Sequence, residues 1–308
     1  MKPKIVIAGS SNTDMVIQTT SLPLPGETVL GGNFFMNAGG KGANQAVAAA
    51  RLGGDITFVA KVGNDVFGKE ALDGFKKENI NTMYVFVDDK NASGIALITV
   101  DTRGENCIAV ASGANAALCV DEIGKAESAI VDADIVLVQL ETPVATVEKF
   151  LQTAFGKGIK TVLNPAPALA LTDNIYQKIF LITPNEKEAS VLSGTAVCNE
   201  DSAKKAAQYF VEKGVQQVII TLGEKGALLY SDRNSFLIPS PKVKAVDTTA
   251  AGDVFNGALV VAIGEGKCIE DAVLFANASA ALSVTRLGAQ ASAPYRWEVE
   301  DFIKQQIR

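Results

Sequence analysis

Short apolar runs alternate with segments of helical periodicity along most of the chain. The run at 4–8 is β-branched and ends at Gly9, which predicts a buried strand. Similar runs predict strands at 56–60, 135–139, 161–163, 180–182 and 217–221. Apolar residues spaced three or four apart predict helices over about 43–50, 67–75, 203–210, 252–263 and 269–284, and one opened by Thr142-Pro143. Strands and helices in alternation are typical of an α/β fold with a doubly wound, mostly parallel sheet flanked by helices.

Two segments depart from this alternation. Residues 14–36 carry proline and glycine turn signals between short apolar runs, one of them at 28–30, which predicts short strands joined by turns. Residues 94–111 predict a hairpin around a turn at 102–105. We expect the two segments to form a small β-sheet lid. No internal repeat or shift in composition marks a second domain, so residues 1–308 are expected to form a single α/β domain.

Composition narrows the functional classes. The net charge is −6 with no basic stripe, so nucleic acid is not expected as a partner. No run of 18 apolar residues and no signal-peptide pattern occurs, which favours a cytoplasmic protein without a membrane partner. The chain has no histidine, so acid–base chemistry falls to Asp, Glu, Lys, Tyr or Cys. The four cysteines form no CxxC pair and are expected to be reduced thiols.

The most informative motif is Asp247-Thr-Thr-Ala-Ala-Gly-Asp253, which opens a predicted helix. Small residues at 250–252 leave backbone N–H groups free to form an anion hole at the helix terminus. Asp253 lies in the first turn, where it can accept a proton from a hydroxyl. An anion hole beside a carboxylate fits phosphoryl transfer. Alternatively, Asp253 only stabilises the helix terminus; the absence of bulky side chains from the motif favours the functional interpretation.

Two further segments offer polar groups near the first strand. Residues 38–44 contain three glycines before an alanine-rich helix, where backbone N–H groups could approach an anion or a polyol. Their spacing matches neither a P-loop nor GxGxxG, and a tight turn with a solvated Lys41 is an equally good interpretation. Asn12 and Asp14 follow the first strand and could bind vicinal hydroxyls, although an Asx turn by itself is the simpler interpretation.

Two later strand ends carry weaker signals. Asn185-Glu-Lys-Glu188 places a carboxylate where it could hold water on Mg²⁺, but a capped helix start explains the pattern as well. Residues 221–226 carry glycines that suit the approach of a nucleotide or a simple turn.

From about residue 4 to 304 the chain resembles the ribokinase family of sugar kinases. The resemblance is carried jointly by Gly39-Gly40-Lys41-Gly42-Ala43-Asn44 and the motif at 247–253, in the family's order. It implies ATP-dependent phosphorylation of D-ribose at O5 to give ribose 5-phosphate. Asp253 would be the catalytic base, and Ala250, Ala251 and Gly252 the anion hole.

The resemblance also implies ligand contacts. The sugar would be bound by Asn12, Thr13, Asp14, Gly40, Lys41, Gly42, Ala43, Asn44, Glu141 and Asp253. ATP would be bound by Asn185, Thr221, Leu222, Gly223, Glu224, Lys225, Gly226, Gly252, Asp253 and Asn277. Glu188 would act on Mg²⁺ through water. A monovalent cation, K⁺, would be held largely by backbone carbonyls around Asp247, Thr249, Ser283, Arg286, Gly288 and Ser292. The lid would close over the sugar and form a homodimer interface.

Three alternatives remain open from the sequence. A related kinase for 2-deoxyribose, fructose or a nucleoside would share the ATP half and differ in the sugar pocket. A nucleotide-binding dehydrogenase is disfavoured because no GxGxxG follows the first strand. A non-catalytic sugar or nucleotide sensor on the same fold is disfavoured because Asp253 and residues 250–252 are intact.

Overall fold

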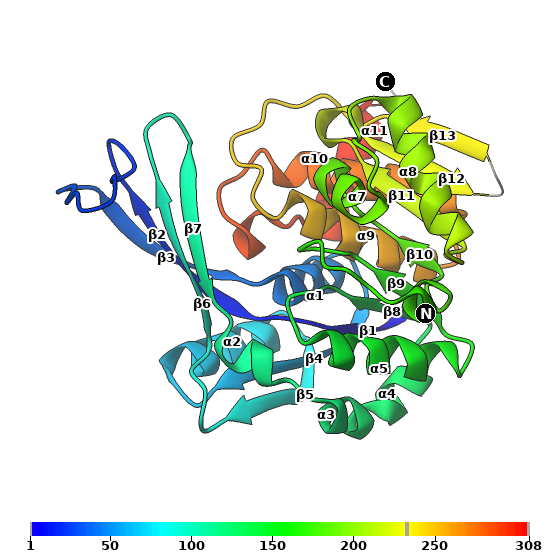
Figure 1. The fold of residues 1–308 in the computed structure, drawn as a ribbon, viewed down its shortest axis with the longest axis horizontal. Helices are drawn as coiled ribbons and strands as arrows, with labels where there is room; N and C mark the ends of the chain where they lie inside the picture. The colour runs from blue at the N-terminus through cyan, green and yellow to red at the C-terminus, as the bar shows by residue number, and fades with distance from the viewer. Residues whose placement is uncertain (1, 232–233, 307–308) are drawn as a thin grey trace.

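A computed structural model describes residues 2–231 and 234–306. Its larger sheet has nine strands in the order β13-β12-β11-β10-β9-β8-β1-β4-β5 (Figure 1). The strands are β1 (Lys4–Ala8), β4 (Asp55–Gly63), β5 (Asn81–Asp88), β8 (Ile135–Val138), β9 (Lys160–Leu163), β10 (Leu181–Ile182), β11 (Gln217–Thr221), β12 (Ala227–Ser231) and β13 (Asn234–Ile238). All neighbours from β5 to β11 are parallel, whereas β12 and β13 are antiparallel. The predicted doubly wound, mostly parallel sheet is confirmed.

Helices cover both faces of this sheet because its strands are apolar on both sides. Ile5 and Ile7 of β1 pack in the same core as helices α1 (Lys41–Arg51), α2 (Val66–Lys77), α9 (Ala251–Gly264), α10 (Ile269–Ser283) and α11 (Arg296–Gln306). Val6 and Ala8 face the other core, with α3 (Val120–Lys125), α4 (Glu127–Val131), α5 (Val144–Phe155), α6 (Asp173–Tyr176), α7 (Glu186–Ser193) and α8 (Glu200–Glu212). Among the described residues, no helix is both long and apolar enough to cross a bilayer.

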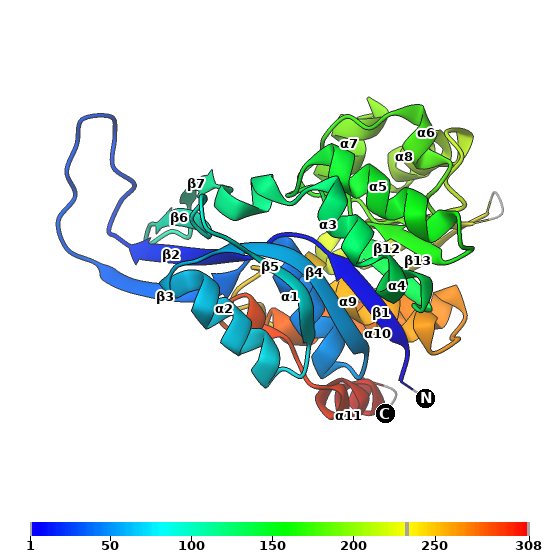
Figure 2. The ribbon, with the colours of Figure 1, turned by 90° about the horizontal axis from the view of Figure 1, so that it is seen from below.

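A separate four-stranded sheet in the order β3-β2-β6-β7 projects from the α/β body (Figures 1 and 2). It is built from β2 (Asn12–Gln18), β3 (Asn33–Gly39), β6 (Gly94–Val100) and β7 (Asn106–Ala111), so the two predicted lid segments do pair with each other. We call it the lid sheet. The strand expected at 28–30 is wrong, because residues 19–32 form a long loop without strand pairing.

One buried side chain ties the lid sheet to the body. Asn115 lies in the 3₁₀ turn η1 (Gly113–Ala117), which follows β7. Its Oδ1 accepts from the Ser11 N–H at 2.8 Å, and its Nδ2 donates to Ser11 O at 3.1 Å and to Asn12 Oδ1 at 2.8 Å. Two of the four crossings between body and lid sheet, at β1–β2 and at β7–η1, are therefore held together by one amide.

Candidate active site

The start of α9 forms an uncapped helix terminus. Ala250 is the N-cap with φ 58°, a left-handed conformation that is uncommon outside glycine. No side chain among the described residues caps this end of the 14-residue helix. Ala251 and Gly252 line a large cleft. The positive end of α9 therefore faces that cleft, where its first backbone N–H groups lie, although the Ala251 N–H also donates to Thr248 O at 3.3 Å.

The Asp253 carboxylate lies in the first turn of α9 and is buried. Asn44 Nδ2 donates to its Oδ2 and Gln45 Nε2 donates to its Oδ1, both at 2.9 Å. Burial raises the pKa of Asp253, although Lys41 and the two amides oppose that shift. Both oxygens are thus oriented by α1, and the group is a stronger base than an exposed aspartate.

The glycines before α1 are required for the close packing of the backbone. Gly40 has φ 88°, and a Cβ on Gly42 would lie 2.6 Å from Gly9 C. The Lys41 N–H donates to Glu141 Oε2 at 3.1 Å, and the Ala43 N–H donates to a backbone carbonyl at 2.9 Å. These two amides therefore have protein partners, and Gly42 and Ala43 are buried.

Charged side chains converge above this helix start. Burial lowers the pKa of Lys41, but nearby carboxylates outweigh it and raise the pKa overall. Those carboxylates belong to Asp253, Glu141, Glu188 and Asp14, and they come from four different parts of the chain. A cation fixed among them can offset the negative charge of a phosphate that enters the site.

The first lid strand contributes Asp14. Burial, followed by the charges of Glu141 and Asp253, raises its pKa to about 6. A Cβ on Gly39 would lie 2.3 Å from Asp14 Oδ2, so only glycine fits beside this carboxylate. Asn12 and Asp14 share one face of β2, whereas Thr13 points to the opposite face because side chains alternate along a strand. The structure thus separates Thr13 from its predicted partners.

The side chain of Asn44 also indicates a bound ligand. Its Oδ1 is buried and has no hydrogen-bond partner among the described residues. Buried polar atoms in native proteins are almost always paired, so an acceptor of this kind beside Asp253 indicates a ligand that donates a hydrogen bond. A sugar hydroxyl has that chemistry.

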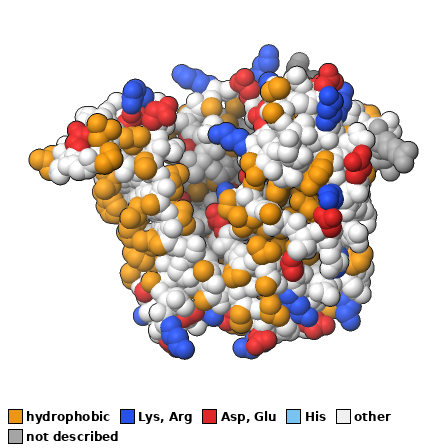
Figure 3. All heavy atoms as spheres, viewed as in Figure 1, with side chains coloured by type: hydrophobic (Ala, Val, Ile, Leu, Met, Phe, Trp, Pro, Cys, Tyr) orange, Lys and Arg blue, Asp and Glu red, His pale blue; other side chains and the backbone are white. Residues whose placement is uncertain are grey.

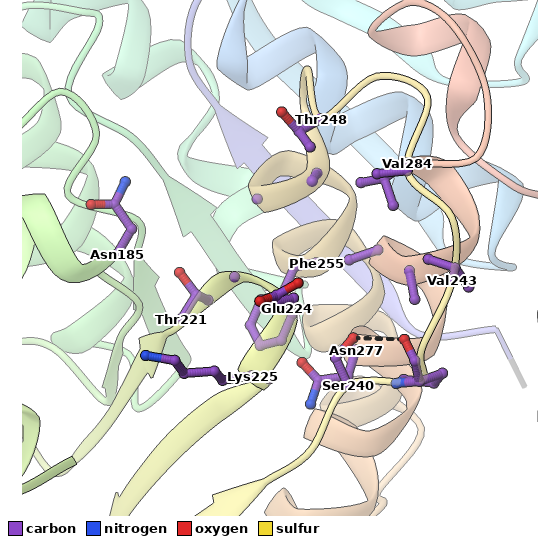
Figure 4. A pocket seen from close by; sticks show the side chains of 18 of the residues that line it. Asn185, Thr221, Glu224, Lys225, Ser240, Val243, Thr248, Phe255, Asn277 and Val284 are labelled. Atoms are coloured by element: carbon purple, nitrogen blue, oxygen red, sulfur yellow. Dashed lines mark hydrogen bonds between the residues drawn. The ribbon is translucent and has the colours of Figure 1, made fainter. Parts of the chain in front are cut away.

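The cleft beside the α9 terminus has a volume of about 1260 Å³ (Figure 4). Asn185, Thr221 and Lys225 line one side, and Val243, Asn277 and Val284 line the other. Of the residues predicted to bind ATP, the cleft is lined by Asn185, Thr221, Gly223, Glu224, Lys225, Gly226, Gly252 and Asn277. The Leu222 side chain instead packs in the core. The lining segment 239–245 was missed, because its prolines and valine carry no recognisable ligand pattern.

Glu188 and Asn185 form a capping box at the start of α7, which is one of the two interpretations of this pattern given above. The Glu188 N–H donates to Asn185 Oδ1, and the Asn185 N–H donates to Glu188 Oε2, both at 2.9 Å. Burial raises the pKa of Glu188, while Lys41 opposes the shift. The carboxylate therefore serves the helix and also lies within electrostatic reach of Lys41 and Asp253.

The segments expected to hold a monovalent cation lie against each other. Asp247 accepts from the Thr249 N–H through Oδ1 and from the Gly288 N–H through Oδ2, both at 2.9 Å. Burial alone would raise the pKa of Asp247, but these hydrogen bonds outweigh it and lower the pKa, which keeps the carboxylate ionised. Across the loop, Arg51 Nη1 donates to Gln290 O and Ala293 O at 2.8 Å.

The side chains of this loop are directed to protein partners. Arg286 is ion-paired with Glu298 at 2.6 Å, and the hydroxyls of Ser283 and Ser292 donate to backbone carbonyls at 2.8 Å. In the part of the chain that the structure describes, no group of three His, Cys, Asp or Glu side chains could hold a metal ion.

The fold and the site together define a phosphotransferase that acts on small polar alcohols, and the comparisons agree. Residues 2–296 match the pfkB family of carbohydrate kinases, and the chain belongs to this family. It is 44% identical to the ribokinase of Haemophilus influenzae over 304 residues, which cover 99% of each chain. It is 37% identical to the deoxyribokinase of Salmonella typhi, covering 94% of this chain and 95% of the relative.

One of the similar solved structures contains bound ligands. The ribokinase of Arabidopsis thaliana, complexed with ribose and ATP, is 31% identical and superposes with a TM-score of 0.91 over 99% of both chains. The predicted family is confirmed, and the dehydrogenase alternative is not supported by any of these relatives.

The raised pKa of Asp14 leads to a prediction about stability. The folded protein binds this proton more tightly than the unfolded chain, so the resulting stabilisation is present below pH 3.8 and is lost as the pH rises to about 6. At about pH 8, Asp14→Asn should increase the free energy of unfolding by about 1–2 kcal/mol, a figure reduced for partial exposure to solvent. Urea titrations of variant and wild type between about pH 4 and pH 8 measure the difference.

The difference should shrink toward low pH. Asp73→Asn, at an exposed carboxylate on α2, is the matched control and should show no such trend. A variant that is less stable than the wild type at high pH would contradict the assignment of Asp14 as a strained, ligand-facing carboxylate.

Proposed function

We propose that this protein transfers the γ-phosphoryl group of ATP to O5 of D-ribose and releases ADP and ribose 5-phosphate. The observation that carries the proposal is the junction at the start of α9. There a buried carboxylate, Asp253, adjoins an uncapped helix terminus that opens into a cleft of about 1260 Å³. The ribokinases similar to this chain support the choice of sugar.

Each part of the junction has a task in the transfer. Asp253 accepts the proton of the O5 hydroxyl as O5 attacks the γ-phosphorus, and the bond to the ADP oxygen breaks. The N–H groups of Ala251 and Gly252 and the ammonium of Lys41 offset the charge on the moving phosphoryl group. Asn44 and Gln45 hold both Asp253 oxygens, so the base is already oriented when the sugar binds.

The sugar lies on the α1 side of this junction in our proposal. The unpartnered Asn44 Oδ1 accepts from a hydroxyl, and Asp14 and Asn12 reach the ring from the lid sheet. Asn12 is held by Asn115 at 2.8 Å, which fixes its amide for recognition. Glu141 Oε2 already accepts from Ser10 and from the Lys41 N–H, so it shapes the site as well as contacting the sugar.

Two metal ions belong to the proposal. Mg²⁺ would bind with the phosphates of ATP and neutralise part of their charge, and Glu188 would orient its water ligands. K⁺ would be held by carbonyls of the loop around Gly288, beside the ionised Asp247. Because this loop lies against the segment that leads into α9, an ion there would stiffen the anion hole from outside the cleft.

We also propose that the lid sheet closes over the sugar and pairs two chains into a homodimer. Its outer face is apolar and exposed, with Phe34 at 60%, Met36 at 48% and Leu97 at 52% (Figure 3). Apolar patches of this kind mark association surfaces. The four free cysteines and the need for ATP support a cytoplasmic enzyme.

A substrate panel tests the choice of sugar. ADP release from MgATP should be fastest with D-ribose and much slower with 2-deoxyribose, D-fructose, adenosine and pseudouridine. The 37% identical deoxyribokinase makes 2-deoxyribose the most important competitor. Turnover with a nucleoside alone would overturn the ribose assignment while leaving a kinase, and no turnover with any of them would favour a sensor.

The role of Asp253 leads to a second prediction. Asp253→Asn should reduce kcat by about 10²–10⁴-fold, because the amide cannot accept the hydroxyl proton. Binding of a nucleotide, measured by calorimetry, should remain, because the cleft is lined by other residues. A variant with near wild-type turnover would remove Asp253 from the mechanism.

The cation loop leads to a third prediction. Replacing Na⁺ by K⁺ at fixed MgATP should raise kcat several-fold and raise the thermal midpoint, since an ion bound to the folded state stabilises it. Asp247→Asn should abolish both responses, whereas Asp89→Asn, at an exposed site, should keep them. Identical rates and midpoints in the two salts would contradict the cation site.

A further inference from the structure

A closed ring of buried hydrogen bonds lies beneath Asp253. Gln45 Nε2 donates to Asp253 Oδ1 and to Asn164 Oδ1, both at 2.9 Å. Asn164 Nδ2 donates to Thr183 O at 3.0 Å, and Thr183 Oγ1 donates to Asn256 Oδ1 at 2.6 Å. Asn256 Nδ2 then donates to Gly252 O at 2.8 Å, and the peptide bond from Gly252 to Asp253 closes the ring.

The members of the ring come from distant parts of the chain. Gln45 lies on α1, Asn164 follows β9, Thr183 follows β10, and Asn256 lies on α9. All four are at least nine-tenths buried. With Asp253, the ring contains five polar residues. Burying polar side chains costs free energy unless each is hydrogen-bonded, so packing alone does not explain a cluster of this size. The ring instead connects both functional parts of the α9 terminus, the carboxylate and the Gly252 backbone.

The hydrogen-bond partners of Gln45 determine the orientation of its side-chain amide. Asp253 Oδ1 and Asn164 Oδ1 only accept, so the amide must direct its nitrogen to them. Gln139 Nε2 donates to Gln45 Oε1 at 2.5 Å, which engages the remaining atom of the amide. The Gln45 amide therefore makes three hydrogen bonds, which fix the directions of its two N–H donors.

We propose that Gln45 is the positioning residue for the Asp253 carboxylate, and that the ring through Asn164, Thr183 and Asn256 locks this carboxylate to the anion hole of α9. Gln45 acts through Asp253 and does not touch the substrate. The inference rests on the proposed function, since it assigns Asp253 the role of base. In this arrangement the carboxylate and the Gly252 amide form one rigid unit, so proton acceptance and charge stabilisation are aligned together.

The ring also tunes the basicity of Asp253. A hydrogen bond donated to a carboxylate favours its charged form, so the Gln45 amide lowers the Asp253 pKa against the raising effect of burial. The other groups that act on this carboxylate are Lys41 and Asn44 from α1, Glu141 after β8, Asp14 from β2 and Glu188 from α7. Loss of the Gln45 donor leaves all of these unchanged, which isolates its contribution.

The test uses Gln45→Met, which keeps the length of the side chain and removes both donors. The expected result is a fall in kcat of about 10- to 100-fold, with KM for ATP unchanged. The acid limb of the pH profile of kcat/KM should move up by roughly one pH unit, because one hydrogen bond to the charged carboxylate is lost. A residue with a merely structural role would lower stability without moving the profile.

Thr161→Val is the matched control for a lost buried hydrogen bond. Thr161 is the second residue of β9, the strand that leads to Asn164, and its buried Oγ1 donates to Lys178 O and accepts from the Phe180 N–H. This variant should lose stability while keeping the wild-type kcat and pH profile. If Gln45→Met shows the same behaviour as this control, the proposal is overturned.

A second variant decides the matter if Gln45→Met does not fold. Thr183→Val breaks the ring at its far side without touching Asp253, so it should lower kcat several-fold with an unchanged acid limb. A wild-type kcat in Thr183→Val would overturn the role of the ring. Failure of the proposed function is distinguishable, because the wild type would then not phosphorylate sugars or Asp253→Asn would remain active.

Discussion

The close contact between helices α1 and α9 is the interaction on which the site depends. Gly257 faces α1 so closely that a Cβ there would lie 2.8 Å from the Cβ of Ala48 and from the backbone oxygen of Gln45. The alanines of α1 and this glycine let the two backbones approach. One turn before Gly257, the same approach brings the amides of Asn44 and Gln45 within 2.9 Å of the Asp253 carboxylate.

In the function that we propose, this contact separates two ligand regions, one on each side of the Asp253 carboxylate. On the α1 side, Lys41 and the carboxylates of Asp14 and Glu141 make a small charged region, to which the lid sheet contributes Asp14 from β2. On the α9 side, the helix terminus opens into the nucleotide-sized cleft. Asp253 lies where the regions meet. A hydroxyl held on one side and a phosphate held on the other would therefore approach each other at the base.

Much of the fold and the chemistry could be predicted locally. The run from Asp247 to Asp253 is recognisable because small residues at a helix start leave N–H groups exposed wherever the helix lies. Most of the parallel strands are recognisable as β-branched runs, but β5 was not among the strands predicted. The antiparallel hairpin of β12 and β13 and the short helices α3 and α4 were missed, because their apolar residues are too few or too irregularly spaced to give a clear period.

The order of apolar residues along the chain predicted an α/β protein, and the motif at 247–253 predicted a phosphate-handling helix terminus. The absence of histidine from the sequence excludes histidine chemistry. The tertiary structure decided which polar groups meet. Gln45 looks in the sequence like any polar residue of an alanine-rich helix, and its partners Asn164 and Asp253 lie 119 and 208 residues away. The close packing of Gly42 is also a tertiary property, because a Cβ there would lie 2.6 Å from Gly9 C and its N–H donates to Ser10 Oγ at 3.4 Å. Hydrogen bonds between distant segments depend on how sheets and helices stack, and no local pattern encodes that stacking.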